Sequence, residues 1–183
     1  PRVYVCDGSE PTLSELLRNV GNTFINTADT TKNMINVGDM TYGSELRYIQ
    51  AASGATTRYM TAPASLLNGL SSWTIDFWLT RDATNAIDTF LTCGAGNDFL
   101  WFFDSSGVIH YQNTVETTLS YGVTNGQVFH FTATGSGGVI TVYKNGVQVG
   151  TMSNNTTISV PSTFGVVFGQ ELDSNSGSFD AAQ

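Results

Sequence analysis

The sequence predicts an all-β protein in which antiparallel sheets form a sandwich, and three observations support this fold class. Only 12% of the 183 residues are charged, while Gly, Ser, Thr and Asn are abundant and occur in short runs typical of turns. From residue 73 onward, short segments rich in β-branched and aromatic residues recur at regular spacing. A chain of this length is long enough for one well-buried core, so we expect a single domain with an appended segment.

The appended segment comprises residues 1–44, which we interpret as a mostly irregular N-terminal arm or attachment segment and as the candidate contact with a protein assembly partner. One stretch, PTLSELLRNVG at 11–21, predicts a short helix, because its apolar residues recur at helical spacing. The remainder, including NTADTTKNMINVGDMTYGS, is polar without clear periodicity. The β-sandwich is therefore expected to occupy residues 45–183.

The predicted strands begin with WTIDFWLT at 73–80, where the odd-numbered residues face the core and Thr74, Asp76 and Trp78 lie on the opposite face. Further strands follow in the order FLTC, FLWFF, VIHYQ, VFHFTAT, VITVYK, VQVGTM and FGVVFG. Between VITVYK and VQVGTM, Asn145 and Gly146 predict a two-residue hairpin turn, because both residue types tolerate positive φ.

Composition also excludes several classes of partner. The formal net charge of −8 repels phosphate backbones and anionic lipid surfaces, so we expect no nucleic-acid partner. No apolar run is long enough to insert into a membrane, and residues 1–30 show no apolar core of a cleavable signal peptide. Cys6 and Cys93 fit neither a metal nor a redox pattern, and free thiols are favoured over a disulfide.

The C-terminal stretch GQELDSNSGSFDAAQ, at 169–183, gathers oxygen-bearing side chains in a chain that is otherwise poor in charge. Glu171, Asp173 and Asp180 lie within ten residues, among Gly and Ser, and Gln183 follows. Calcium takes six to eight oxygen ligands from carboxylates, amides and carbonyls on tightly folded loops. A solvated acidic connection is the alternative, because the same residue types are common in turns.

Three segments resemble the pentraxin and laminin G-like group of concanavalin A-like jelly-roll sandwiches, over about residues 46–183. They are SSWTIDFWL, GGVITVYKNGVQVG and FGVVFGQELDSNSGSFDAAQ, and the last resembles the pentraxin calcium loop most specifically. The resemblance implies an antiparallel jelly-roll β-sandwich. Pentraxin relatives continue past the final Gln, so the last strands are expected to be missing, or to come from the arm, a neighbouring subunit or a longer polypeptide.

The resemblance also implies a set of Ca²⁺ ligands. Glu171 and Asp173 stand at carboxylate ligands, and Leu172 stands where the backbone carbonyl binds. Asp180 and Gln183 stand at ligands of a second ion. An earlier loop of the family supplies an Asp-Asn pair, for which the candidates in this sequence are Asn97 and Asp98.

The function expected from these features is non-catalytic, calcium-dependent recognition of carbohydrate or another polar surface ligand, in the manner of a lectin. Trp78, Trp101 and Tyr111 are candidates to stack on a sugar, with core packing as the alternative for each. A second hypothesis is a structural subunit, such as a decoration or fibre protein of a virus particle. Both settings predict a location outside the cell or on a virion surface.

A glycan hydrolase is a minor alternative, because the same sandwich carries enzymes that use two carboxylates flanking the scissile bond. Nothing in the sequence sets such a geometry for Asp76 and Asp82. His110 and His130 alternate inside predicted strands and are interpreted as solvent-facing or hydrogen-bonded residues. The N-x-T sequons at Asn154 and Asn155 are interpreted as an exposed loop.

Overall fold

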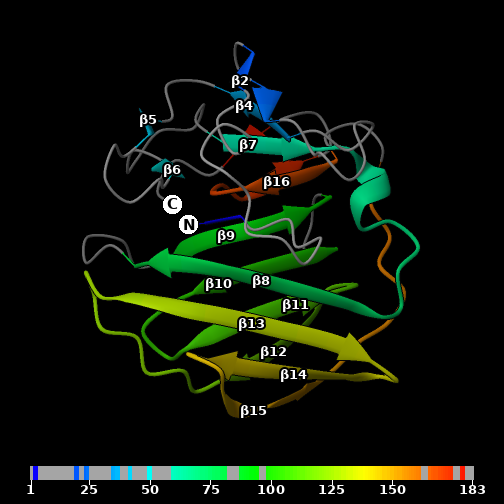
Figure 1. The fold of residues 1–183 in the computed structure, drawn as a ribbon. Helices are drawn as coiled ribbons and strands as arrows, with labels where there is room; N and C mark the ends of the chain where they lie inside the picture. The colour runs from blue at the N-terminus through cyan, green and yellow to red at the C-terminus, as the bar shows by residue number, and fades with distance from the viewer. Residues whose placement is uncertain are drawn as a thin grey trace.

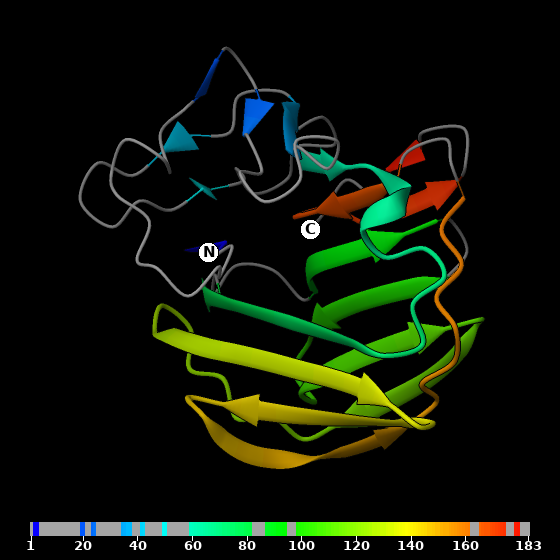
Figure 2. The same ribbon diagram turned by 45° about the vertical axis from the view of Figure 1, so that its right-hand side comes forward.

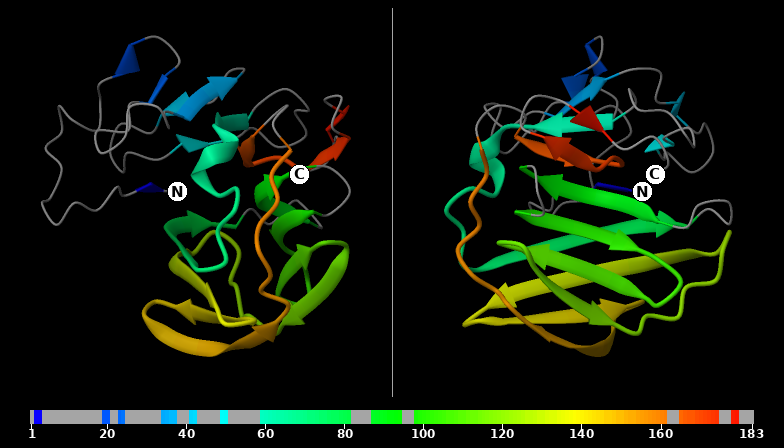
Figure 3. Two further views of the ribbon diagram at one scale, coloured as in Figure 1. Left: turned by 90° about the vertical axis from the view of Figure 1, so that its right-hand side faces the viewer. Right: turned by 180° about the vertical axis from the view of Figure 1, so that it is seen from behind.

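Two antiparallel sheets lie face to face in the protein, as the sequence predicts (Figure 1; Figure 3). The computed structural model describes residues 59–81, 87–94, 98–161 and 165–174, together with a few short strands outside these ranges. A 3₁₀ turn, η2, spans Ala64–Leu66 between the first long strands. In the described part of the chain, no helix is long and apolar enough to cross a membrane.

The first sheet has five strands in the order β1-β8-β13-β14-β15. Their bounds are Arg2–Val3 for β1, Trp73–Thr80 for β8, Val128–Ser136 for β13, Val139–Lys144 for β14 and Val147–Ser153 for β15. The predicted hairpin turn joins β14 to β15, and Asn145 and Gly146 have φ values of 51° and 78°. The Asn145 side chain also accepts a hydrogen bond from the His130 backbone N–H. The predicted turn is therefore confirmed, and the hydrogen bond from His130 links it to β13.

The second sheet has nine strands in the order β12-β11-β10-β9-β16-β7-β4-β3-β2. Their bounds are Val115–Leu119, Val108–Gln112, Phe99–Phe103, Asp88–Cys93, Val166–Phe168, Tyr59–Ala62, Met34–Val37, Thr23–Phe24 and Asn19–Val20, in the same order. Two small hairpins pair β17 (Leu172–Ser174) with β18 (Ser178–Phe179), and β5 (Thr41–Tyr42) with β6 (Ile49–Gln50). Figure 2 shows the two sheets closing around one interior.

Short strands from residues 1–44 join both sheets. β1 pairs with β8, and β4 pairs with β7. The predicted helix at 11–21 lies outside the described residues, except that Asn19–Val20 form β2 instead. The division of the chain at residue 44 remains a prediction.

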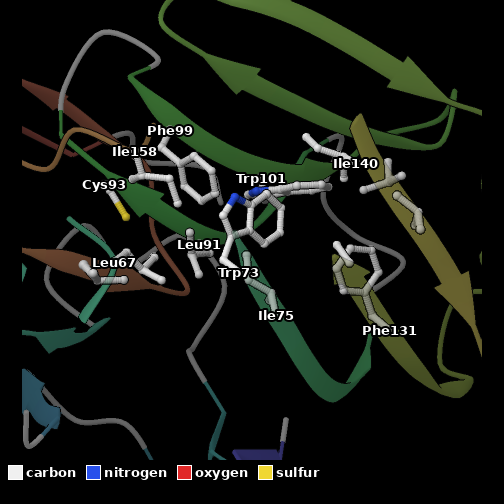
Figure 4. Packing of buried hydrophobic residues seen from close by; sticks show 14 of the residues in the cluster. Leu67, Trp73, Ile75, Leu91, Cys93, Phe99, Trp101, Phe131, Ile140 and Ile158 are labelled. Carbon is white, nitrogen blue, oxygen red and sulfur yellow. The ribbon is translucent and has the colours of Figure 1, made fainter. Parts of the chain in front are cut away.

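The core is filled by the inward-facing residues of both sheets, and large aromatic rings dominate it. Trp73, Phe99, Trp101 and Phe131 meet there, and Figure 4 shows the two indoles side by side between the sheets. The rings of Trp73 and Trp101 lie 6.1 Å apart at 82°, an edge-to-face arrangement. Such pairs add about 0.5–1.5 kcal/mol each to what burial alone contributes. The free Cys93 thiol is buried in the same core, where desolvation raises its pKa.

The connection from β15 to β16 is tied to the sandwich by side-chain hydrogen bonds, of which the one from Trp73 to Asn155 is buried. The Trp73 indole N–H donates to Asn155 Oδ1 at 2.8 Å, and Asn155 Nδ2 donates to the Ser71 carbonyl at 2.9 Å. Asn154 Nδ2 donates to the carbonyls of Gln112 and Val115. The prediction of an exposed loop is therefore wrong for Asn155, which is only 7% exposed. The buried indole needs an acceptor, and this amide supplies it.

Gly135 provides the room for that hydrogen bond. A Cβ atom at Gly135 would lie 2.3 Å from the Trp73 ring and 2.5 Å from Asn155 Oδ1. Gly135→Ala is therefore expected to lower the free energy of unfolding by about 2–3 kcal/mol, as overpacking of a core does. Urea denaturation followed by tryptophan fluorescence measures the loss.

The matched control is Gly122→Ala, because a Cβ atom there meets nothing within 4 Å and the backbone φ is not positive. This variant should stay within about 0.5 kcal/mol of the wild type. Equal losses in both variants would contradict the role of Gly135.

Candidate functional site

An aromatic side chain stands open on the outer face of the five-stranded sheet. Trp73, Ile75 and Leu79 of β8 turn into the core, so the alternation of the strand directs Trp78 outward. The Trp78 side chain is 39% exposed, and the prediction of an exposed aromatic residue is confirmed at this position. Its strand partner across the sheet is His130 of β13.

Polar neighbours hold the Trp78 ring in place. The rings of Trp78 and His130 have centroids 4.9 Å apart and planes inclined by 31°. His130 Nε2 lies 2.8 Å from Asp76 Oδ1, and the Thr132 hydroxyl donates to the same oxygen at 2.5 Å. We call Asp76, Trp78, His130 and Thr132 the Trp78 cluster. It combines an open ring face with hydrogen-bonding groups, which suits a ligand that has both apolar and hydroxyl-bearing faces.

The sequence predicted that Asp76 and Trp78 share a face of their strand, but it did not predict that His130 and Thr132 join them. Alternation along VFHFT places His130 and Thr132 on one face of β13, and His130 was correctly predicted to be solvent-facing or hydrogen-bonded. What the sequence lacks is the register, which sets His130 opposite Trp78 and Thr132 opposite Asp76. Register is decided by how the two strands pair, and neither strand carries that information alone.

A second cluster lies on the face of the nine-stranded sheet that points away from the interior of the sandwich. Leu100, Phe102 and Ile109 are all buried there, and the partly exposed Tyr111 packs against them. The Tyr111 hydroxyl donates to Glu116 Oε2. That hydrogen bond, followed by partial burial and by the charges of Glu116 and Glu171, raises the pKa of Tyr111 to about 12. Tyr111 is thus a partly exposed neutral phenol, already engaged with its neighbour.

The predicted calcium ligands are only partly within the described residues. Glu171 is partly buried, and its charge acts on Tyr111. Asp98, another predicted ligand, lies two residues before Leu100, which is the strand partner of Tyr111. Leu172 begins β17, with its side chain 3% exposed.

The other predicted ligands leave the calcium site untested. Asp173 lies in β17, but its side chain is outside the described part, as are Asn97, Asp180 and Gln183. Among the described residues, no three His, Cys, Asp or Glu side chains form a group that would hold a metal ion.

The prediction that Trp101 stacks on a sugar is wrong, because this residue is fully buried. In FLWFF all five residues are buried, and Phe99, Trp101 and Phe103 turn toward the interior of the sandwich. The ring of Trp101 stacks on His110 at 4.1 Å. The alternative of core packing is therefore the correct interpretation of Trp101.

His110 is buried in the same region, and its Nδ1 lies 3.1 Å from the Leu100 carbonyl oxygen. Burial lowers the pKa of His110 from 6.5 to about 4, so the ring is neutral at pH 7. The unfolded chain therefore takes up a proton below about pH 6.5 that the folded protein does not accept until about pH 4. The free energy of unfolding should fall over that interval by up to about 3 kcal/mol on account of this residue.

This prediction is checked by urea denaturation of the wild type and His110→Gln at pH 7.5, 6, 5 and 4.5. As the pH falls, the free energy of unfolding should decrease more in the wild type than in His110→Gln. The titration of the carboxylates affects both proteins equally, so it cancels in this comparison. His130→Gln separates this effect from that of the other histidine. A pH-independent difference between wild type and His110→Gln would contradict the prediction.

Comparison with known protein families identifies the class to which this sandwich belongs. Residues 53–182 match the family described as the concanavalin A-like lectin/glucanases superfamily, and the chain belongs to that superfamily. The resemblance to laminin G-like domains is confirmed at this level. A comparison with curated protein sequences finds no match.

Solved structures share the fold at low sequence identity. A structure of botulinum neurotoxin type C, whose cell entry is described as dependent on two ganglioside molecules, is 16% identical with a TM-score of 0.56. The match covers 75% of this chain and 38% of that chain. The binding domain of botulinum neurotoxin DC in complex with SialylT is 14% identical with a TM-score of 0.54, covering 75% of this chain and 39% of that one. This chain therefore spans well under half the length of those toxin chains.

A third similar structure is domain 4 of AbnA, a GH43 extracellular arabinanase from Geobacillus stearothermophilus, in complex with arabinotriose. It is 14% identical with a TM-score of 0.56, and the match covers 79% of this chain and 72% of that chain. At these identities the likeness establishes the fold alone. This fold is of a type that occurs in binding domains.

Proposed function

We propose that this protein is a non-catalytic carbohydrate-binding domain and that the Trp78 cluster is its binding surface. The observation that carries the proposal is the exposed Trp78 ring, held by His130 and surrounded by hydrogen-bonding groups. A sugar presents C–H groups on its faces and hydroxyls at its edges. The indole would stack on a face, while the Asp76 carboxylate and nearby hydroxyls would bind the edge.

The charge distribution on this sheet supports binding over hydrolysis. Glycosidases of the usual kind need two carboxyl groups about 5–9.5 Å apart. The five strands of the sheet contain one acidic residue, Asp76, which is engaged with His130 and Thr132. These strands therefore offer no pair of carboxyl groups that would act as acid and nucleophile.

The relatives also support a carbohydrate ligand. Gangliosides are named for one similar structure and arabinotriose for another, and both are carbohydrate or carbohydrate-bearing molecules. The alternative of a structural subunit, and the location outside a cell or on a virion, remain predictions from the sequence.

The proposal predicts that Trp78→Ala removes sugar binding without unfolding the protein. A panel of neutral and sialylated glycans is screened on an array, and each hit is titrated by isothermal calorimetry. Loss of stacking on one aromatic ring should weaken binding by at least about tenfold.

The matched control for this experiment is Val147→Ala, which truncates an apolar side chain that is 70% exposed on the same sheet. This control should bind like the wild type. Wild-type protein that binds no glycan of the panel, or Trp78→Ala with undiminished affinity, would refute the proposal.

We further propose that Ca²⁺ binds near the C-terminal segment, through Glu171, Asp173 and the Leu172 carbonyl, with Asp98, Asn97, Asp180 and Gln183 as further oxygen ligands. The chemistry of the donor set supports this ion, because carboxylate, amide and carbonyl oxygens are its preferred ligands. Glu171, Leu172 and Asp173 are consecutive, which places two carboxylates and a backbone carbonyl in one short segment at the start of β17. When bound, the ion would supply positive charge and open coordination positions to a polar ligand.

Calorimetric titration of the metal-free protein with Ca²⁺ tests this second proposal. The double variant Glu171→Ala with Asp173→Ala should lose affinity by about tenfold or more, because two carboxylate ligands are removed. Asp76→Ala removes a carboxylate from the other sheet and should leave Ca²⁺ binding unchanged. Wild-type protein that shows neither heat nor a gain in melting temperature would rule out the site.

A further inference from the structure

A row of four threonines crosses the outer face of the five-stranded sheet. Thr74 of β8 pairs with Thr134 of β13, Thr134 pairs with Thr141 of β14, and Thr141 pairs with Thr151 of β15. Thr74 and Thr151 are exposed, and the other two are partly exposed. We call these four residues the threonine row. With strands about 4.8 Å apart, the row spans about 14 Å.

The hydroxyl groups of the threonine row are available to a ligand. None of them makes a hydrogen bond with another described residue, in contrast to Thr132, which donates to Asp76. A hydroxyl both donates and accepts, so each position would satisfy a sugar hydroxyl in either role. β-branched side chains have few rotamers, which keeps these groups in place before a ligand arrives.

The threonine row and the Trp78 cluster lie on one continuous face. Thr74 and Trp78 are four residues apart on β8, which corresponds to about 13 Å along the strand. A further set of paired residues lies between Trp78 and the threonine row: Asp76 is opposite Thr132, and Thr132 is opposite Tyr143. Figure 1 shows β8, β13 and β14 running side by side across this face. One or two sugar units are too short to reach from Trp78 to the threonine row.

Charge and shape narrow the class of ligand further. The four threonines are uncharged, and the protein carries a net charge of −8, which disfavours anionic polymers. A twist of about 20° between neighbouring strands turns the row progressively from one end to the other. A flat crystalline surface would therefore touch only part of the row, whereas a single flexible chain follows the twist.

Building on the proposed function, we propose that the ligand is an uncharged linear polysaccharide, with one sugar stacked on Trp78 and the following sugars extending to the threonine row. The Trp78 cluster provides the apolar contact, and the threonine row adds hydrogen bonds to sugars further along the chain. Affinity should consequently rise with chain length until the ligand spans both parts of the face.

The test uses the full chain and linear arabino-, xylo-, cello- and manno-oligosaccharides of two to six units, titrated by calorimetry. Thr134→Val with Thr141→Val removes two hydroxyls and keeps β-branched side chains suited to the sheet. For the hexasaccharide that the wild type binds best, this variant should lose about tenfold in affinity, as expected for two hydrogen bonds. For the disaccharide of the same series, its affinity should equal that of the wild type.

The matched control is Thr61→Val, which makes the same change on β7 of the other sheet and should not alter binding. Thr151→Val, at an exposed position on β15, tests the row again with less risk to folding, and melting curves verify the fold of each variant.

The outcomes separate this inference from the proposed function. If Trp78→Ala abolishes binding but affinity does not rise with length, or the threonine variants bind the hexasaccharide like the wild type, the extended ligand is wrong and the carbohydrate-binding function stands. If the wild type binds no sugar of any length, the proposed function and this inference both fail.

Discussion

The buried hydrogen bond from the Trp73 indole to Asn155 is the interaction on which the rest of this sandwich depends. It joins β8, which pairs with β1 and β13 in the five-stranded sheet, to the connection that carries the chain from β15 across to β16 in the other sheet. Asn155 also holds the Ser71 carbonyl, so the same amide fixes the entry to β8. Gly135 leaves the space, and the edge-to-face contact with Trp101 completes the environment of the indole. A polar pair in an apolar core contributes only when it is satisfied, and here the indole N–H and both ends of the amide are used.

The same alternation that buries Trp73 exposes Trp78. Because successive side chains of a strand point to opposite faces, filling the interior with aromatic rings leaves a complete second set of residues on the outer face of the five-stranded sheet. Among the described residues, that set consists mostly of uncharged side chains, both threonines and exposed apolar residues such as Trp78 and Val139, and Asp76 lies 2.8 Å from His130. Such a face costs little to desolvate compared with a charged one, which favours binding of a neutral, hydroxyl-rich partner.

The two proposed binding features lie on different sheets of the sandwich. The Trp78 cluster and the threonine row belong to the five-stranded sheet, whereas Tyr111, whose pKa responds to the charge of Glu171, belongs to the nine-stranded sheet. A core about 10 Å thick separates the two outer faces, and a calcium ion on one would act only weakly on a sugar bound to the other. Sugar binding at Trp78 is therefore expected to be independent of calcium, in contrast to the calcium-dependent binding that the sequence alone suggested.

The sequence by itself determined the fold class, the eight strands β8 to β11 and β13 to β16, and the turn at Asn145-Gly146, because these follow from alternation and from local backbone preference. It missed β12, whose segment VETTL is mostly polar and exposed. It also separated Trp78 from the core-facing residues of β8. It did not separate Trp101 from a surface residue, since FLWFF is apolar on both faces and alternation is silent there. Tertiary structure alone decided that His130 lies opposite Trp78, that four threonines line up across four strands, and that Asn155 is buried. The reason is physical: register and the partner of a buried polar group depend on residues far apart in the chain, which only the folded sheet brings together.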